Sequence, residues 1–294
     1  ALKKAYEFNC LQDFLDIYYE GAKVLITEQD FYELTIAYME RAVQDNVIHT
    51  EIFFDPQTHL ERGIDFKIFF NGIYKACKDA EKKWGISSYL IMCFLRHLDE
   101  KSAFDTLKLA LPYKKNIIGI GLDSSENGNP PSKFQNVFEA AKKEGFKILA
   151  HAGEEGPPQY IWEAIKLLNV ERIDHGNQCI NDKELIKEII DRGLGLTMCP
   201  LSNLKLAVIN KLEDHPAKTL INEGVFVSIN SDDPAYFGGY INKNLINLSK
   251  ALGLSNENIL TLVKNSFITS FLEEDIKAQK IEDLEKAYKQ FLIS

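Results

Sequence analysis

A histidine and a carboxylate stand three residues apart in residues 147–158, where a short apolar run ends in a glycine- and proline-rich break. His151 follows the apolar run, and Glu154 comes after Gly153, whose freedom to turn brings the carboxylate back toward the imidazole. An imidazole can bind a metal ion, and a carboxyl group can act as a general acid. This stretch is therefore a candidate site for metal-assisted acid–base chemistry.

Two further segments place similar side chains at the ends of apolar runs. His175 follows residues 172–174, and Asp232 and Asp233 follow residues 226–231. Adjacent carboxylates are costly to bury unless they bind a cation or accept hydrogen bonds. Neutral imidazole and carboxylate are ligands that suit Zn²⁺, which generates a hydroxide near neutral pH.

Each of these residues has a plainer interpretation when it is taken alone. A histidine at a strand end is more often a hydrogen-bonded structural residue, and two aspartates before a proline more often begin a helix. Their coincidence at three strand ends favours a shared site. Other chemistries lack their motifs, because the sequence has no GxxxxGK[ST] phosphate loop, no GxSxG elbow and no HxE with PCxxC.

The spacing of apolar residues predicts strands that alternate with helices. Polar residues follow strands throughout the chain, which favours a closed barrel, with all strand ends at one mouth, over an open sheet. A (βα)₈ TIM-type barrel needs eight strands, so we expect the first strand to lie upstream of Ala1. Helices are predicted over residues 1–46, 65–83, 136–144 and 161–168. Seven strands are predicted, over residues 47–56, 88–95, 117–122, 147–150, 172–174, 195–198 and 226–229.

The composition is that of a globular α/β protein and argues against several classes of partner. The formal net charge of −9 gives no support for binding to nucleic acid or to an anionic membrane. The five cysteines are scattered without a CxxC pair, which is typical of reduced thiols in the cytoplasm. The longest apolar run, residues 89–95, is too short to span a bilayer. We expect one cytoplasmic domain over residues 1–294, of undetermined oligomeric state.

At these motifs the sequence resembles the adenosine/adenine deaminase family of metal-dependent hydrolases. The segments that carry the resemblance are His151-Ala152-Gly153-Glu154, Arg172-Ile173-Asp174-His175-Gly176, Cys199-Pro200-Leu201-Ser202-Asn203 and Ser231-Asp232-Asp233-Pro234. Within the family it is more similar to the adenine deaminase branch, through Phe54-Asp55-Pro56-Gln57-Thr58-His59 and Gly121-Leu122-Asp123-Ser124. The likeness runs from Asn9 to the C-terminus.

The resemblance implies a (βα)₈ barrel that holds one Zn²⁺ and deaminates adenine to hypoxanthine and ammonia by a zinc-activated water, as in purine salvage. His151 and Asp232 would be metal ligands. Glu154 would donate a proton to the ring atom N1, and His175 would position and deprotonate the attacking water. We expect the pKa of Glu154 to be raised, since it must be protonated before the attack.

The same resemblance implies three residues that contact a small-molecule purine base. Asp233 would hydrogen-bond the substrate or the attacking water. Asp123 and Ser124 would lie against the ring, where adenosine deaminases carry a glycine. Our hypothesis is that the bulk near Ser124 helps to exclude ribose, so that the free base fits.

The sequence departs from the family in its first metal ligands. The family places a His-x-His pair on the first barrel strand, and no such pair occurs in the 294 residues. We expect that pair upstream of Ala1. Three alternatives stay open: deamination of adenosine or another N6-substituted purine, a non-catalytic purine-binding barrel, and another metal-dependent hydrolase such as a phosphoesterase.

Overall fold

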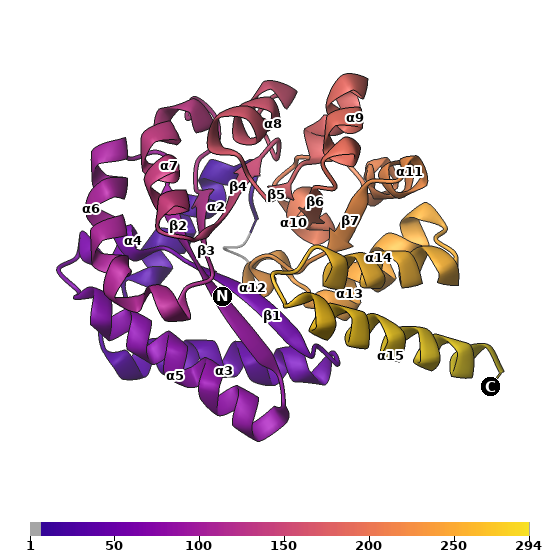
Figure 1. The fold of residues 1–294 in the computed structure, drawn as a ribbon, viewed down its shortest axis with the longest axis horizontal. Coiled ribbons are helices and arrows are strands. Elements are labelled where there is room, and N and C mark those ends of the chain that lie inside the picture. Colours follow the sequence, from indigo (N-terminus) through magenta and orange to yellow (C-terminus); the bar gives the residue numbers. More distant parts are fainter. Residues whose placement is uncertain (1–6, 294) are drawn as a thin grey trace.

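A curled sheet of seven parallel strands, in the order β1-β2-β3-β4-β5-β6-β7, forms the framework of the chain (Figure 1). The computed structural model describes residues 7–293. Each strand pairs with the next in sequence, so the strand ends that follow one another in the chain also lie side by side. The predicted α/β barrel-type fold is confirmed. The strands are β1 (His49–Phe54), β2 (Ser87–Leu95), β3 (Gly119–Asp123), β4 (Lys147–Ala152), β5 (Arg172–His175), β6 (Gly195–Met198) and β7 (Phe226–Ile229).

Helices between the strands cover the outside of the sheet (Figure 1). The helix predicted over residues 161–168 is α-helical only in its first part, and a π-helix (Ala164–Leu168) continues it. The prediction of helix over residues 1–46 is confirmed for α2 and α3, while residues 1–6 lie outside the described residues. The helices are α2 (Leu11–Ala22), α3 (Glu28–Gln44), α4 (Pro56–Leu60), α5 (Phe66–Trp84), α6 (Glu100–Ala110), α7 (Gln135–Lys143), α8 (Pro158–Glu163), α9 (Lys183–Asp191), α10 (Pro200–Lys205), α11 (Ala217–Glu223), α12 (Pro234–Phe237), α13 (Ile241–Leu252), α14 (Asn256–Ile268) and α15 (Glu274–Ile293).

Alternate residues of β2 serve two separate cores. Leu90, Met92 and Phe94 belong to the large apolar cluster that includes residues of the surrounding helices. Ile91 and Cys93 belong instead to a small cluster with Leu149 of β4 and Phe53 of β1. Successive side chains of a strand point to opposite faces, so β2 has one face toward the helices and one toward the interior of the curled sheet.

A buried ion pair crosses the interior between β1 and β5. Glu51 of β1 accepts hydrogen bonds from the guanidinium of Arg172 on β5 and from the backbone N–H of Phe271. These partners are far apart in the strand order, so the pair ties the first strand to the middle of the sheet. Burial acts to raise the pKa of Glu51, but Arg172 and His49 hold it at about 2.

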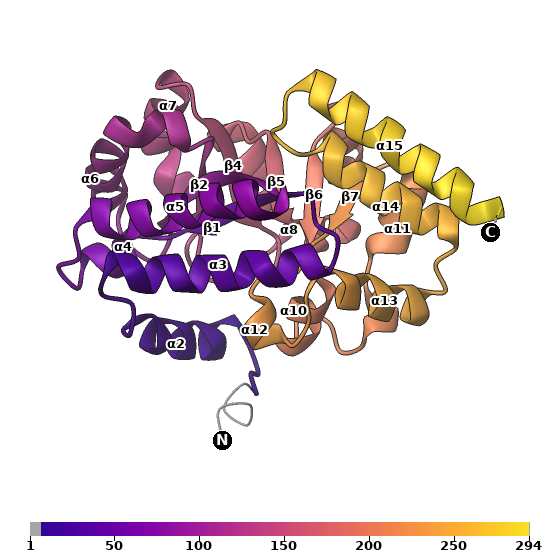
Figure 2. The same ribbon diagram turned by 90° about the horizontal axis from the view of Figure 1, so that it is seen from below.

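Helix α2 packs against segments that follow the last two strands. Phe14 and Leu15 of α2 form an apolar cluster with Leu206 and Phe237, which follow β6 and β7. Figure 2 shows α2 beneath α3, on the same side of the molecule as α10 and α12. The first helix therefore reaches across the end of the sheet where these segments lie.

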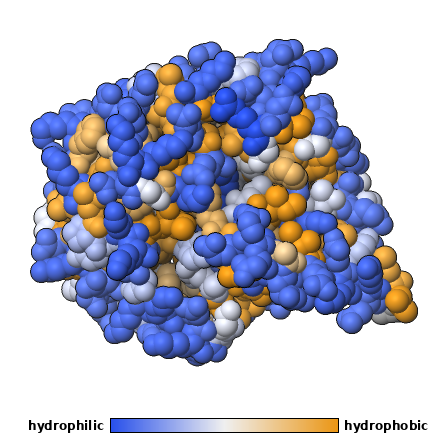
Figure 3. All heavy atoms as spheres, viewed as in Figure 1, coloured by the Kyte–Doolittle hydropathy of each residue, from blue (hydrophilic) through white to orange (hydrophobic). Residues whose placement is uncertain are grey.

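The face drawn in Figure 3 mixes hydrophilic and apolar residues, with apolar atoms across its middle and also at the tip of α15. Leu292 and Ile293 at that tip are largely exposed. Among residues 7–293, no helix has the length and apolar character needed to cross a membrane.

Candidate active site

A pocket of about 120 Å³ opens where the carboxyl ends of the strands meet α2. Ligand sites of barrels lie at this end of the strands. A wider hollow of about 560 Å³, lined by residues such as Asn177, His215 and Leu252, contains none of the predicted site residues. All seven predicted residues line the smaller pocket: Asp123, Ser124, His151, Glu154, His175, Asp232 and Asp233.

Glu154 and His175 form a buried acid–base pair. The Glu154 Oε2 and His175 Nε2 atoms are 3.6 Å apart, and both side chains are almost fully buried. Burial, together with the charges of Asp232 and Glu126, raises the pKa of Glu154 to about 8. Burial acts to lower the pKa of His175, but the carboxylates of Glu154 and Asp232 raise it overall. The raised pKa of Glu154 agrees with the expectation that the family resemblance set for this carboxyl group.

His151 is a buried, neutral imidazole beside His175. Their ring centroids are 5.0 Å apart. Burial and the neighbouring His175 lower the pKa of His151 to about 3. Its Nδ1 atom lies 3.7 Å from Asp174 Oδ2 and has no hydrogen-bond partner among the described residues. Thr197 holds Asp174 in place by donating a 2.8 Å hydrogen bond to its other carboxylate oxygen.

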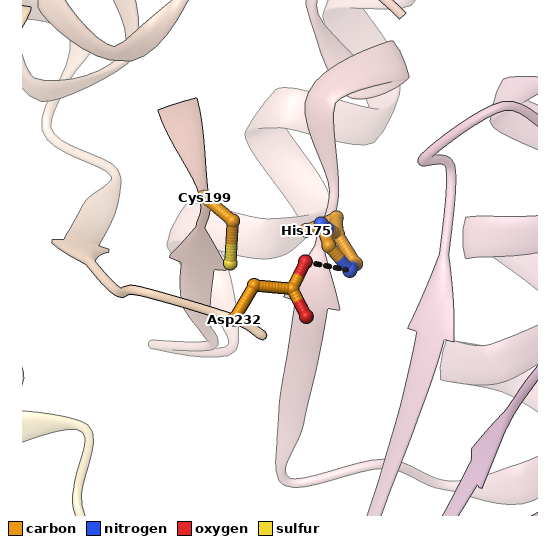
Figure 4. A group of neighbouring side chains, drawn as sticks. All are labelled: His175, Cys199 and Asp232. Atoms are coloured by element: carbon orange, nitrogen blue, oxygen red, sulfur yellow. Dashed lines mark ion pairs between the residues drawn. The ribbon is translucent and has the colours of Figure 1, made fainter. Parts of the chain in front are cut away.

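Asp232 reaches toward His175 from the end of β7 (Figure 4). Its Oδ2 atom lies 4.0 Å from His175 Nε2. One atom each of His175, Cys199 and Asp232 lies within 4.8 Å of the others, as close as ligands of one ion. Burial raises the pKa of the Cys199 thiol well above its ordinary value, so this sulfur is protonated and a poor ligand.

The neighbouring Asp233 occupies the N-cap position of α12, but its side chain makes no capping hydrogen bond. The backbone of Asp233 therefore begins a helix, as the plainer interpretation of the aspartate pair expects. Its side chain does not cap that helix. Burial and the adjacent Asp232 raise the pKa of Asp233 well above its ordinary value.

Three of the pocket residues have a backbone conformation that side chains rarely adopt. His175, Asp232 and Ser124 have φ angles of 63°, 55° and 74°, in the left-handed region. Each follows the end of a strand or closes it, where the chain turns sharply away. Strain of this kind is typical of functional sites, where the surrounding fold holds a side chain in place.

The residues present fit a zinc site in their chemistry. His151 is a neutral imidazole whose Nδ1 atom has no hydrogen-bond partner among the described residues, and Asp232 offers a carboxylate that lines the same pocket. Imidazole and carboxylate are both ordinary zinc ligands. These two residues are fewer than the three protein ligands expected of a catalytic zinc site, and the His-x-His pair stays a prediction.

Asp123 ends β3 and Ser124 follows it, two strands away in the sheet from β5, which ends at His175. The Ser124 hydroxyl is within hydrogen-bond distance of Tyr19 Oη at 2.7 Å and of His97 Nδ1 at 2.8 Å. Asp123 is hydrogen-bonded to the carboxyl group of Asp55, which follows β1. The sequence pattern assigned no role to Asp55 or to His97.

The loop that carries Glu154 is held by a second buried carboxylate, Glu126. Its two oxygens accept four backbone N–H bonds of 2.6–3.0 Å, from residues 153, 154, 155 and 156. A Cβ on Gly156 would meet this carboxylate at 2.7 Å, and one on Gly153 would meet Ile161 at 2.4 Å. Sequence reasoning missed Glu126, because nothing in its local pattern shows that it reaches a loop 27 residues later.

The adenosine deaminase family model matches residues 1–287 of the chain. The adenine deaminase of Acinetobacter baylyi is 58% identical over 283 residues, which cover 96% of this chain and 85% of that protein. The adenine deaminase of Marinomonas sp. is 56% identical, with 97% and 85% covered.

Two solved structures are similar over most of the chain. The adenine deaminase from Arthrobacter aurescens is 45% identical, with a TM-score of 0.96 over 98% of this chain and 88% of that one. An amidohydrolase from Burkhoderia ambifaria, whose structure has bound Zn, is 26% identical, with a TM-score of 0.86 and 90% and 75% covered.

Proposed function

The chain belongs to the adenosine deaminase family, and we propose that it is an adenine deaminase that converts adenine and water into hypoxanthine and ammonia. Its relatives at 52–58% identity carry the name adenine deaminase. The observation that supports the proposal most is the buried pair of Glu154 and His175 in a pocket lined by carboxylates.

The barrier to this reaction is the loss of aromaticity when water attacks C6 of the ring. Glu154 is protonated near neutral pH and donates its proton to N1, so that negative charge does not accumulate on the ring. His175 accepts a proton from the attacking water. Asp233 orients the water or the substrate through a hydrogen bond. Each role for these residues comes from the pocket geometry and the family resemblance together.

His151 and Asp232 would hold a zinc ion, one per chain. When bound, zinc supplies Lewis-acid chemistry that makes water acidic near neutral pH. The neutral state of His151 supports this role, because a protonated imidazole cannot bind a metal. The product of the reaction, a free purine base, is consistent with a place in purine salvage.

Ammonia release from adenine, measured beside adenosine and N6-methyladenine, tests the proposal. We expect adenine to be the best substrate and hypoxanthine to be the product. Faster turnover of adenosine would contradict the substrate assignment. Metal analysis of the protein should find about one zinc per chain, and a protein with neither zinc nor ammonia release would instead be a binding barrel.

A further inference from the structure

Two carboxyl groups that line the pocket lie at the ends of strands other than those that carry the acid–base pair. Asp55 follows β1 and Asp123 ends β3, and both line the pocket. Their side chains are joined by a hydrogen bond, which requires one of the two to be protonated. Burial and the neighbouring Asp55 raise the pKa of Asp123 well above its ordinary value, in agreement with that arrangement.

The pair has oxygen atoms that nothing in the described chain satisfies. The Oδ1 atoms of Asp55 and Asp123 are both buried without a hydrogen-bond partner. Asp123 is 9% exposed. Such groups are costly in a folded protein, which retains them where a ligand completes their hydrogen bonds.

A cation is a poor candidate for that ligand. Cys93 lies with the two aspartates within 4.8 Å, a spacing that could hold a metal ion. Burial, however, raises the pKa of the Cys93 thiol well above its ordinary value, and the proton between the aspartates leaves them with one negative charge. A thiol and a half-neutralised carboxyl pair suit a hydrogen-bonding ligand better than a divalent ion.

The place of the pair in the pocket indicates which part of a purine it meets. Glu154 and His175 lie at the ends of β4 and β5, whereas Asp55 and Asp123 follow β1 and β3. If C6 and N1 of the ring face the acid–base pair, the opposite edge of the ring carries N3 and N9. In a free base that edge offers an acceptor at N3 beside a donor at N9–H. A carboxyl pair that holds one proton offers the complementary set once that proton turns from the partner carboxyl group toward the ring: one group donates to N3, and the other accepts from N9–H.

We propose that the Asp55–Asp123 carboxyl pair hydrogen-bonds the N3 and N9–H edge of the purine and thereby selects the free base over any N9-substituted purine. This inference rests on the proposed function, since it uses the orientation of the ring that deamination requires. It adds Asp55 as a specificity-determining residue. A substituent at N9 removes the donor and leaves a buried carboxylate oxygen unpaired, a mismatch that sites built for an N–H group reject strongly.

The test compares adenine with 9-methyladenine, in which a single methyl group replaces the N9 hydrogen. For the natural enzyme we expect kcat/KM to be about 10⁴-fold higher for adenine. Asp55→Ala should lower kcat/KM for adenine by about 10²-fold or more and change that for 9-methyladenine by less than threefold, so that selectivity falls. Asp55→Asn keeps an N–H donor and a carbonyl acceptor, and should stay within about tenfold of the natural enzyme on adenine.

Asp65→Ala is the matched control, because Asp65 is an exposed carboxylate ten residues along the chain and its side chain caps nothing. It should leave both kcat/KM values unchanged. Metal content should be equal in all variants. Loss of metal in Asp55→Ala, or an equal fall on both substrates, would overturn the inference.

Binding separates this inference from the proposed function. Titration calorimetry of the product hypoxanthine and of 9-methylhypoxanthine with the natural enzyme should give a Kd at least 10²-fold lower for hypoxanthine. Selective binding without any turnover would overturn the proposed function and leave the inference standing. Turnover of adenine with equal binding of the two bases would overturn the inference and leave the proposed function standing. Because this measurement uses the unmodified protein, it decides the point even if Asp55→Ala fails to fold.

Discussion

Glu154 is a carboxyl group whose surroundings keep it protonated where ordinary carboxyl groups are charged. The residue is 3% exposed. Burial contributes more than any one of the neighbouring charges to the rise of its pKa to about 8. The nearby His175 imidazole acts in the opposite direction. The competition between burial and that imidazole leaves a proton donor of nearly neutral pKa, which is what general-acid catalysis at neutral pH requires.

Glu154→Gln should therefore abolish most turnover while substrate and metal binding remain. The glutamine side chain has the same shape and still hydrogen-bonds, but it cannot transfer a proton. We expect kcat to fall by about 10²–10⁴-fold, with KM and zinc content within threefold of the natural enzyme. Steady-state kinetics with adenine and metal analysis measure these quantities. Near-normal turnover would remove Glu154 from the mechanism.

Residue types at strand ends predicted five of the residues that line the pocket, and the family resemblance added Asp123 and Ser124. Their roles stay predictions. The sequence could not identify Asp55, Glu126 or Tyr19 as partners of those residues, because each makes its contact with a strand or loop far along the chain. A local sequence pattern indicates what chemistry a side chain can do. Contacts between distant segments depend on how the strands and loops pack in the fold.

At the scale of elements, the short loop after β4 is positioned by hydrogen bonds to one side chain. Glu126, which is 1% exposed, accepts the N–H groups of four successive residues of this loop. Glu155 of the same loop accepts the N–H of Leu11, at the start of α2. The loop thus connects the acid–base pair to the helix that covers the pocket.

Glu126→Ala should displace Glu154 without removing any group that meets the substrate. A shift of about 1 Å at a reacting group costs on the order of 10²-fold in rate, so we expect a fall of that size in kcat. Buried N–H groups left without acceptors should also lower Tm. Kinetics and thermal unfolding measure both effects. The control is Glu139→Ala, an exposed residue of α7, and equal kcat for the two variants would show that the loop does not depend on Glu126.

The ion pair between β1 and β5 should make stability depend on acid pH. The pKa of Glu51 is about 2 in the fold against 4.5 ordinarily, so the native state releases this proton more readily than the unfolded chain. Its contribution, about 3 kcal/mol, is complete above about pH 4.5 and is lost as pH falls toward 2. Urea unfolding between pH 7 and pH 3 measures it.

Glu51→Gln should lack that contribution and should unfold more easily at pH 7, because the buried Arg172 loses the carboxylate of Glu51 and keeps only that of Asp174, 3.6 Å away. The exposed Glu282→Gln is the control. A pH dependence of stability that is identical in Glu51→Gln and in the natural protein would contradict the assignment to this pair.

At the scale of the whole molecule, the sequence predicted the strand–helix alternation and the barrel-type curvature. All seven predicted strands agree with the structure to within two residues at each end. Long apolar runs between glycines and prolines account for that agreement. The packing of α2 against residues 206 and 237 was not predictable, since its amphipathic pattern gives the buried face but not the partner.

Purine binding should stabilise the whole fold, because the pocket is built from five strand ends and α2. Hypoxanthine at a hundredfold excess over its Kd should add about 2.7 kcal/mol to the free energy of unfolding and raise Tm. Uracil at the same concentration is the control and should leave Tm unchanged. A Tm that does not respond to either base would contradict a purine site in this pocket.

The four N–H groups around Glu126 amount to an anion receptor that the protein fills with its own side chain. Backbone N–H groups that converge in this way bind small anions. Glu126→Gly would leave a hole of carboxylate size in front of them. Added formate should enter it and restore activity in proportion to its concentration, while chloride or a larger carboxylate such as benzoate should not. The activity of the Glu126→Gly variant would then depend on the concentration of added formate.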